Sequence, residues 1–220
     1  MRRLLVVAAG AALLATPSSA APSAQVVDPA NDANGGAYWA GDPDTVTPAG
    51  SQSYADVTAL RFATTKTTKR VGRRTVTTVT GLTVTMTLTA APVAPADATG
   101  IYRVFAMGPK CVVGIEHYTR PLPNIVQPRT AVFDTCRGSL RRTALKAPAI
   151  KGTTITWTVP LTAVPKDTKV GVGTTLTNLH FEVYVAHQAA CAQSQPGGEQ
   201  PPCAFMLDTT FQRSATFAIR

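Results

Sequence analysis

The stretch Leu82-Thr83-Val84-Thr85-Met86-Thr87-Leu88-Thr89 decides the fold class. In it, an apolar side chain alternates with a threonine at every step. Because successive side chains of a β-strand point to opposite faces, this period of two predicts a strand with one buried and one solvated face. Threonine suits the solvated face, since β-branched residues are favoured in strands.

Apolar or alternating runs on both sides of this stretch predict further strands. Trp157 alternates with Ile155 and Val159 in one of them and is expected to face the core. Gly (16 residues) and Pro (17 residues) are spread between the runs, and no helical period is convincing. We therefore expect an all-β protein, an antiparallel β-sandwich. Its other strands are predicted near residues 57–63, 101–107, 112–118, 129–136, 154–159, 176–186 and 214–219.

A polar, basic segment at residues 64–75 precedes the deciding stretch and is predicted to be a protruding hairpin tip. Five cations flank Gly72, and they make the segment a candidate site for a polyanion such as teichoic acid. No aromatic residue lies between the cations, so stacking on nucleic-acid bases is not expected. The alternative is a solvated hairpin tip without a ligand. The candidate polyanion-binding residues are Lys66, Lys69, Arg70, Arg73 and Arg74.

The N-terminus has the pattern of a signal peptide. Arg2 and Arg3 precede an apolar run over residues 4–15, which is too short for a stable membrane anchor. Small residues before position 21 predict cleavage after Ala20. We expect residues 1–20 to be removed, and residues 21–220 to form one secreted domain without stable membrane insertion. The alternative is an uncleaved membrane anchor.

The net charge points to anionic partners. The chain carries a formal charge of +9 at pH 7, and loss of Arg2 and Arg3 lowers this to +7. A basic balance of this size favours anionic surfaces such as cell-wall polymers.

Four cysteines in an exported chain predict two disulfides, because the compartment is oxidising. Three pairings are possible, and we expect the sequential one because each bridge then closes a local loop. The expected bridges are Cys111–Cys136 and Cys191–Cys203.

An aspartate-rich loop follows the predicted cleavage site. Asp28, Asp32, Asn34 and Asp56 are the expected ligands of a structural Ca²⁺ ion, which prefers carboxylate, amide and carbonyl oxygens. The spacing is not that of an EF-hand. The alternative is turn chemistry alone, since Asp and Asn bond their own backbone in turns.

Two aromatic residues lie in the same loop. Tyr38 and Trp39 are the expected ligand-binding residues, because exposed aromatic rings stack on sugar rings. The alternative is that both rings are buried at an edge of the sandwich.

Catalytic motifs are missing from the sequence. A glycosidase needs two carboxylates across a cleft, yet the only glutamates are Glu116, Glu182 and Glu199, and four of the nine aspartates lie between residues 28 and 44. No Gly-x-Ser-x-Gly motif is present. We therefore expect a protein that is not an enzyme and binds no nucleotide.

The order of four short motifs resembles a known family. These are Asp28-Pro29-Ala30-Asn31-Asp32, Tyr54-Ala55-Asp56-Val57, the Trp-containing run at 154–161 and the Gly-rich run at 170–179. Together they resemble the DOMON-like and family-9-like carbohydrate-binding modules, nearest to the C-terminal domain of glucodextranase. The resemblance implies a jelly-roll-like sandwich of about ten strands that binds sugar or haem, with structural calcium in several members. Haem is not expected here, because no Met/His pair can be assigned as axial ligands.

The expected function is therefore a secreted, non-catalytic binding module for carbohydrate or a cell-envelope glycan. The alternative is a structural or adhesive envelope protein. It would bind anionic polymers through the 66–74 segment and a second basic cluster at residues 137–151.

Overall fold

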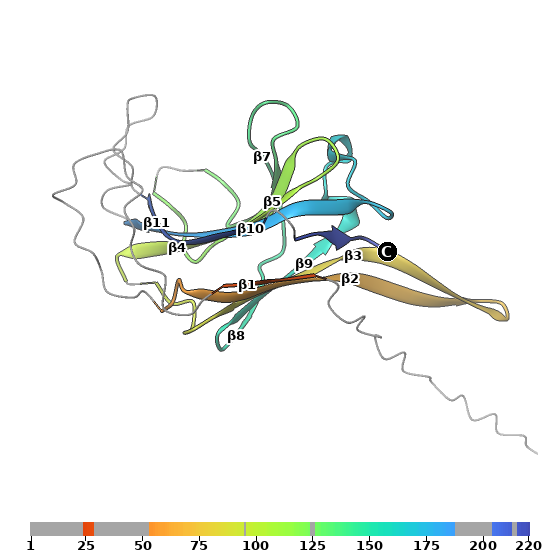
Figure 1. The fold of residues 1–220 in the computed structure, drawn as a ribbon, viewed down its shortest axis with the longest axis horizontal. Helices are drawn as coiled ribbons and strands as arrows, with labels where there is room; N and C mark the ends of the chain where they lie inside the picture. The colour runs from red at the N-terminus through yellow and green to blue at the C-terminus, as the bar shows by residue number, and fades with distance from the viewer. Residues whose placement is uncertain (1–23, 29–52, 95, 124–125, 188–203, 213–214) are drawn as a thin grey trace, which may run out of the picture.

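The computed structural model shows two antiparallel sheets packed face to face (Figure 1). It describes residues 24–28, 53–94, 96–123, 126–187, 204–212 and 215–220. The predicted signal peptide lies outside these residues. Within the described ranges, no helix has the length and apolar character needed to cross a bilayer.

One sheet has five strands in the order β1-β2-β3-β9-β8, and every neighbouring pair is antiparallel. Its two central strands, β2 and β3, are the longest in the described structure, with 15 residues each. The strand bounds are β1 (Ala24–Val27), β2 (Val57–Val71), β3 (Arg74–Leu88), β8 (Ala149–Lys151) and β9 (Thr154–Pro160).

The other sheet has seven strands in the order β11-β10-β4-β5-β6-β7, and the short β12 pairs with the start of β10 beside β11. Two 3₁₀ turns, η2 (Leu161–Ala163) and η3 (Lys166–Thr168), connect β9 to this sheet. The strand bounds are β4 (Ala98–Met107), β5 (Val112–Tyr118), β6 (Thr130–Asp134), β7 (Arg141–Ala144), β10 (Thr175–His187), β11 (Ala204–Gln212) and β12 (Phe217–Ala218).

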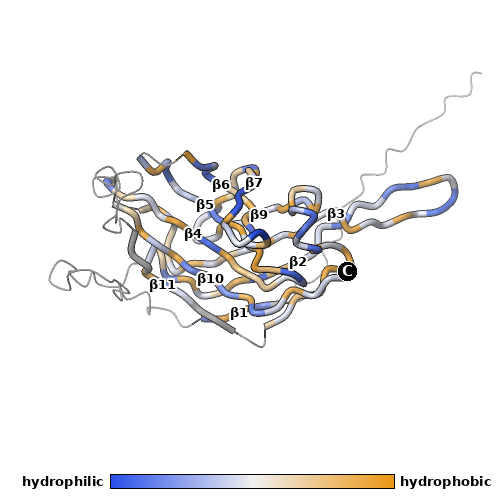
Figure 2. The backbone as a smooth tube through the Cα atoms, turned by 90° about the horizontal axis from the view of Figure 1, so that it is seen from above, coloured by the Kyte–Doolittle hydropathy of each residue, from blue (hydrophilic) through white to orange (hydrophobic). Residues whose placement is uncertain are grey.

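The alternating stretch in β3 forms the wall of the core, as predicted. Leu82, Val84, Met86 and Leu88 are all buried, whereas the threonines between them face outward and are only partly buried. Val84 is paired with Trp157 on β9, and that ring is also buried. Figure 2 shows the same alternation of apolar and polar residues along the strands.

The prediction of an antiparallel β-sandwich is confirmed, and the described structure has twelve strands where about ten were expected. The jelly-roll connection remains a prediction. Sequence patterns missed the short β1, β7 and β8, and also β11. The predicted strand at residues 57–63 continues through the basic segment as far as Val71.

Candidate functional site

The most prominent exposed feature is a two-stranded hairpin, residues 64–80, which we call the basic arm. β1 pairs with β2 only as far as Phe62, and β9 pairs with β3 only from Gly81 onward. Beyond those points the two strands pair only with each other, and the arm projects away from the sandwich (Figures 1 and 2). From Thr64 to Val71 the arm extends about 24 Å at the usual rise per residue.

A tight turn closes the arm. Val71 pairs with Arg74, so Gly72 and Arg73 form a two-residue loop. Gly72 has φ +60°, and a positive φ at the first central residue alone is the arrangement of a type II′ turn. Such turns match the twist of the flanking strands, so the sequence Val-Gly-Arg-Arg ends the hairpin without bending it.

The cations of the arm lie on both of its faces. Lys66 is opposite Val79, which packs against the core cluster, so this face continues the inner face of the sheet. By strand alternation, Arg70 belongs to the same face. Lys69 is opposite the exposed Val76 and lies on the outer face, together with Arg74.

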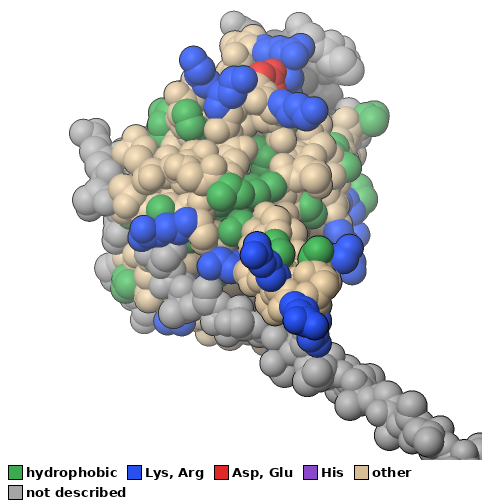
Figure 3. All heavy atoms as spheres, turned by 90° about the vertical axis from the view of Figure 1, so that its right-hand side faces the viewer, with side chains coloured by type: hydrophobic (Ala, Val, Ile, Leu, Met, Phe, Trp, Pro, Cys, Tyr) green, Lys and Arg blue, Asp and Glu red, His purple; other side chains and the backbone are tan. Residues whose placement is uncertain are grey.

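The arm itself contains no acidic residue. Residues 57–96 contain six Lys or Arg residues and no Asp or Glu. The five arm cations are exposed, and none forms an ion pair with a carboxylate in the described ranges. Figure 3 looks at the end of the molecule from which the arm projects, where blue Lys and Arg side chains mark its tip. The predicted hairpin is therefore confirmed as an element, and its polyanion ligand stays a proposal.

The second basic cluster, at residues 137–151, differs from the arm because its arginines are paired. Arg137 lies 3.0 Å from Asp167, and Arg141 lies 2.6 Å from Asp134 and 2.9 Å from Asp167. The hydrogen bonds from Arg141 and then Arg137 lower the pKa of Asp167 to about 2. The cations of this cluster that form no ion pair in the described ranges are therefore its two exposed lysines, Lys146 and Lys151.

Arg142 and Arg103 hold the one fully buried glutamate of the described structure, Glu116 on β5. Arg142 Nε lies 2.5 Å from Glu116 Oε1, and Arg103 Nε lies 3.2 Å from Oε2. The Tyr118 hydroxyl also donates to Oε2 at 3.2 Å. Both oxygens of this carboxylate therefore accept hydrogen bonds from arginine or tyrosine side chains.

The aspartate-rich loop is only partly visible. Asp28 at the end of β1 and Asp56 before β2 are both buried, and Asp56 Oδ2 accepts a hydrogen bond of 2.7 Å from the Thr89 hydroxyl. Asp32 and Asn34 lie outside the described residues, as do Tyr38 and Trp39. The calcium site and the aromatic sugar contacts therefore stay predictions.

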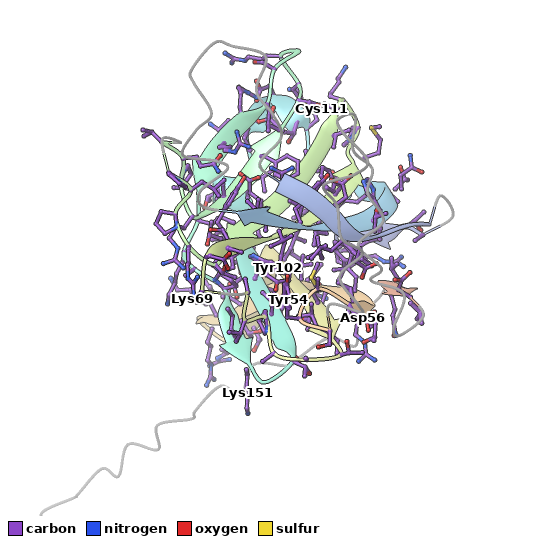
Figure 4. The ribbon with its side chains drawn as sticks, turned by 90° about the vertical axis from the view of Figure 1, so that its left-hand side faces the viewer. Tyr54, Asp56, Lys69, Tyr102, Cys111 and Lys151 are labelled. Carbon is purple, nitrogen blue, oxygen red and sulfur yellow. A yellow bond between two sulfur atoms is a disulfide. The ribbon has the colours of Figure 1, made fainter. Side chains whose placement is uncertain are left out.

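Another buried aspartate, Asp208, was missed by the sequence analysis. Asp208 Oδ2 accepts a hydrogen bond of 2.7 Å from the backbone N–H of Val57, so β11 of one sheet is tied to β2 of the other. Tyr102 makes a second link between the layers, because its hydroxyl donates to the Tyr54 carbonyl at 2.8 Å (Figure 4). Burial, and then the neighbouring Tyr54, hold the pKa of Tyr102 well above its usual value. Sequence analysis would have singled out Asp208 only by recognising the strand that contains it, β11.

The predicted bridge Cys111–Cys136 is confirmed, with 5.0 Å between the two Cα atoms. β5 pairs with β6 at Val113 and Asp134, so the two cysteines lie directly opposite each other just beyond the paired strands. Cys191 and Cys203 are outside the described residues, and their bridge stays a prediction. Among the described residues, the only cluster with metal-ligand spacing is Cys111, Asp134 and Cys136, whose thiols are already joined.

No protein-family model, curated protein or solved structure matches this chain.

Proposed function

We propose that this chain is an exported, non-catalytic binding protein that holds an anionic envelope polymer with its basic arm. The observation that supports this is the arm itself, with five exposed cations and no acid on a hairpin that stands clear of the sandwich. An isolated two-stranded hairpin is marginally stable in water. A ligand that lies along the arm should therefore stabilise it.

A linear polyanion fits the arm better than a compact anion does. The cations are spread over about 17 Å between Lys66 and Arg74 and over both faces of the arm, so all five cannot contact one phosphate or sulfate group. A flexible polymer with repeating charges can contact several of them in turn and release its counterions. The expected glycan ligand depended on Tyr38 and Trp39, whereas the arm is fully described. For that reason the proposal is based on the arm.

The direct test compares two variants of equal charge by calorimetry with polyphosphate. The arm variant K66Q/K69Q/R70Q/R74Q removes four arm cations. The control K110Q/K146Q/K151Q/K166Q removes four exposed lysines from other parts of the surface, two of them in the second basic cluster, so it also tests that cluster as the site. We expect the arm variant to lose more than about tenfold in affinity, which corresponds to roughly 1.4 kcal/mol, and the control to lose much less. Equal losses in the two variants would show that net charge alone attracts the polymer, and would reject the arm as the site.

A further inference from the structure

An apolar cavity lies between the two sheets at the root of the basic arm. Its volume is about 50 Å³, and its wall is almost entirely hydrocarbon. Phe62 and Leu82 contribute to the wall from β2 and β3, and Val164 and Val170 contribute from the segment after β9. Polar groups with which water could bond are missing from this wall, and an apolar cavity of this kind stays dry and accepts apolar groups.

Part of the cavity wall lies at the end of the molecule that carries the arm, because Phe62 and Leu82 are at the root of the arm. Val170 is only partly buried, and Met107 and Val172 nearby are 39% and 64% exposed. In Figure 3 hydrophobic side chains are exposed in the centre of this end, above the arm. Exposed apolar groups rimmed by cations are typical of an interaction site.

The inner face of the arm continues the wall of the cavity along β2. Phe62 lines the cavity, and Thr64, Lys66 and Thr68 follow it at alternate positions of the same strand. Lys66 is therefore about 14 Å from Phe62 along the strand. Its cross-strand partner Val79 packs against the core cluster, which confirms that this face is continuous with the interior.

We infer that the cavity and the inner face of the arm together bind a single anionic amphiphile, with its alkyl end in the cavity and its anionic head at Lys66 and Arg70. This inference rests on the proposed anion-binding role of the arm and adds that the polymer or headgroup carries an alkyl chain. Charge complementarity selects the occupant, since the only charges on the arm are positive. A volume of about 50 Å³ holds only the last carbon atoms of the chain, since a single water needs about 10–15 Å³ of such space.

The probe for this test is dodecyl phosphate below its critical micelle concentration, with inorganic phosphate and dodecyl maltoside as comparison ligands. Trp157 is a natural reporter, because it pairs with Val84 of the cavity wall. In a Trp39→Phe background it is the only tryptophan. We expect dodecyl phosphate to change the Trp157 emission and to bind more tightly than either comparison ligand.

Two double variants with equal charge changes test where the anionic head binds. K66Q/R70Q removes the inner-face cations, and K69Q/R74Q removes two from the outer face. Loss of a charge-assisted contact weakens binding about tenfold, so K66Q/R70Q should lose that factor for dodecyl phosphate while K69Q/R74Q changes little. Polyphosphate should respond equally to both pairs, so this comparison separates the present inference from the proposed function.

Two further variants test whether the alkyl end binds in the cavity. Val170→Phe adds bulk at a partly buried residue of the cavity wall, whereas Val172→Phe adds the same bulk at an exposed position outside the wall, and neither adds a tryptophan. Only Val170→Phe should abolish the emission change. If Val170→Phe does not fold, the two charge pairs still decide. Dodecyl phosphate that binds no better than inorganic phosphate, equal losses from the two pairs, or binding only to phosphatidylglycerol vesicles would each overturn the inference.

Discussion

At the scale of single residues, His117 gives the structure a defined response to acid. It is buried on β5, and its Nδ1 lies 2.9 Å from the Thr130 hydroxyl oxygen. Burial first, and then the charge of Arg129, lower the pKa of His117 to about 4. An unfolded histidine has a pKa of about 6.5, so the unfolded chain takes up the proton first as the pH falls.

The resulting prediction is a loss of stability between pH 6.5 and pH 4. The contribution of His117 is fully present above pH 6.5 and decreases as the pH falls toward 4, by at most about 3 kcal/mol. Urea unfolding of the wild type and of His117→Gln at pH 7 and pH 4.5 measures this effect. The difference in stability between the two proteins should shrink at the lower pH. A constant difference would mean that His117 titrates normally in the folded protein.

Residue patterns predicted the core positions well and the polar links poorly. Leu82, Val84, Met86 and Trp157 are buried where strand alternation placed them, because burial of one face leaves a local period in the sequence. Asp208 and Tyr102 have no such signal. Their partners, the Val57 N–H and the Tyr54 carbonyl, are backbone groups far away in the sequence, and only the packing of the sheets brings them together.

At the scale of elements, local sequence patterns also failed to predict the full length of the basic arm. The polar composition of residues 64–75 predicted a hairpin tip, but the hydrogen-bonded ladder continues through it from Val57–Leu88 to Val71–Arg74. Threonine-rich strands pair well when both faces are solvated, and then no apolar period marks them. The short β7 and β8 were missed for a similar reason, since both faces of these strands carry little apolar surface.

An arm that contributes little to the core should be removable. We predict that replacing residues 66–80 by Asn-Gly, which links the paired Thr65 and Gly81 by a two-residue turn, keeps the fold. Val79 is the one described hydrophobic residue of the deleted part that packs on the core, so the melting temperature should fall by less than about 5 °C. A protein that no longer folds would show that the arm belongs to the core structure, and not to a separate ligand-binding element.

At the scale of the whole molecule, structural calcium is the prediction that concerns the end opposite the arm. Asp28 and Asp56 are two buried carboxylates of the four proposed ligands. An ion that binds only the folded state at about 100 times its Kd adds roughly 2.7 kcal/mol of stability. We therefore expect millimolar Ca²⁺ to raise the melting temperature by about 5–10 °C over EDTA, and Asp56→Asn to remove that shift. Equal melting temperatures in the two buffers would leave the loop with turn chemistry alone.

The distribution of charge over the molecule is the basis of the proposed function. Four arginines of the sandwich form ion pairs with Glu116, Asp134 and Asp167, whereas the arm has cations and no acid. Net charge attracts a polyanion from a distance, but only closely spaced exposed cations displace the counterions of the polymer.

The salt dependence of polyphosphate binding tests this account most directly. Each cation that neutralises a polymer charge contributes about −0.7 to −0.9 to the slope of log Kobs against log[salt]. K66Q/K69Q/R70Q/R74Q should therefore have a slope about 3 units less steep than the wild type between 50 and 200 mM salt. The control K110Q/K146Q/K151Q/K166Q should keep the wild-type slope. A wild-type slope in the arm variant, or tight binding that is independent of salt, would contradict the arm as the polymer site.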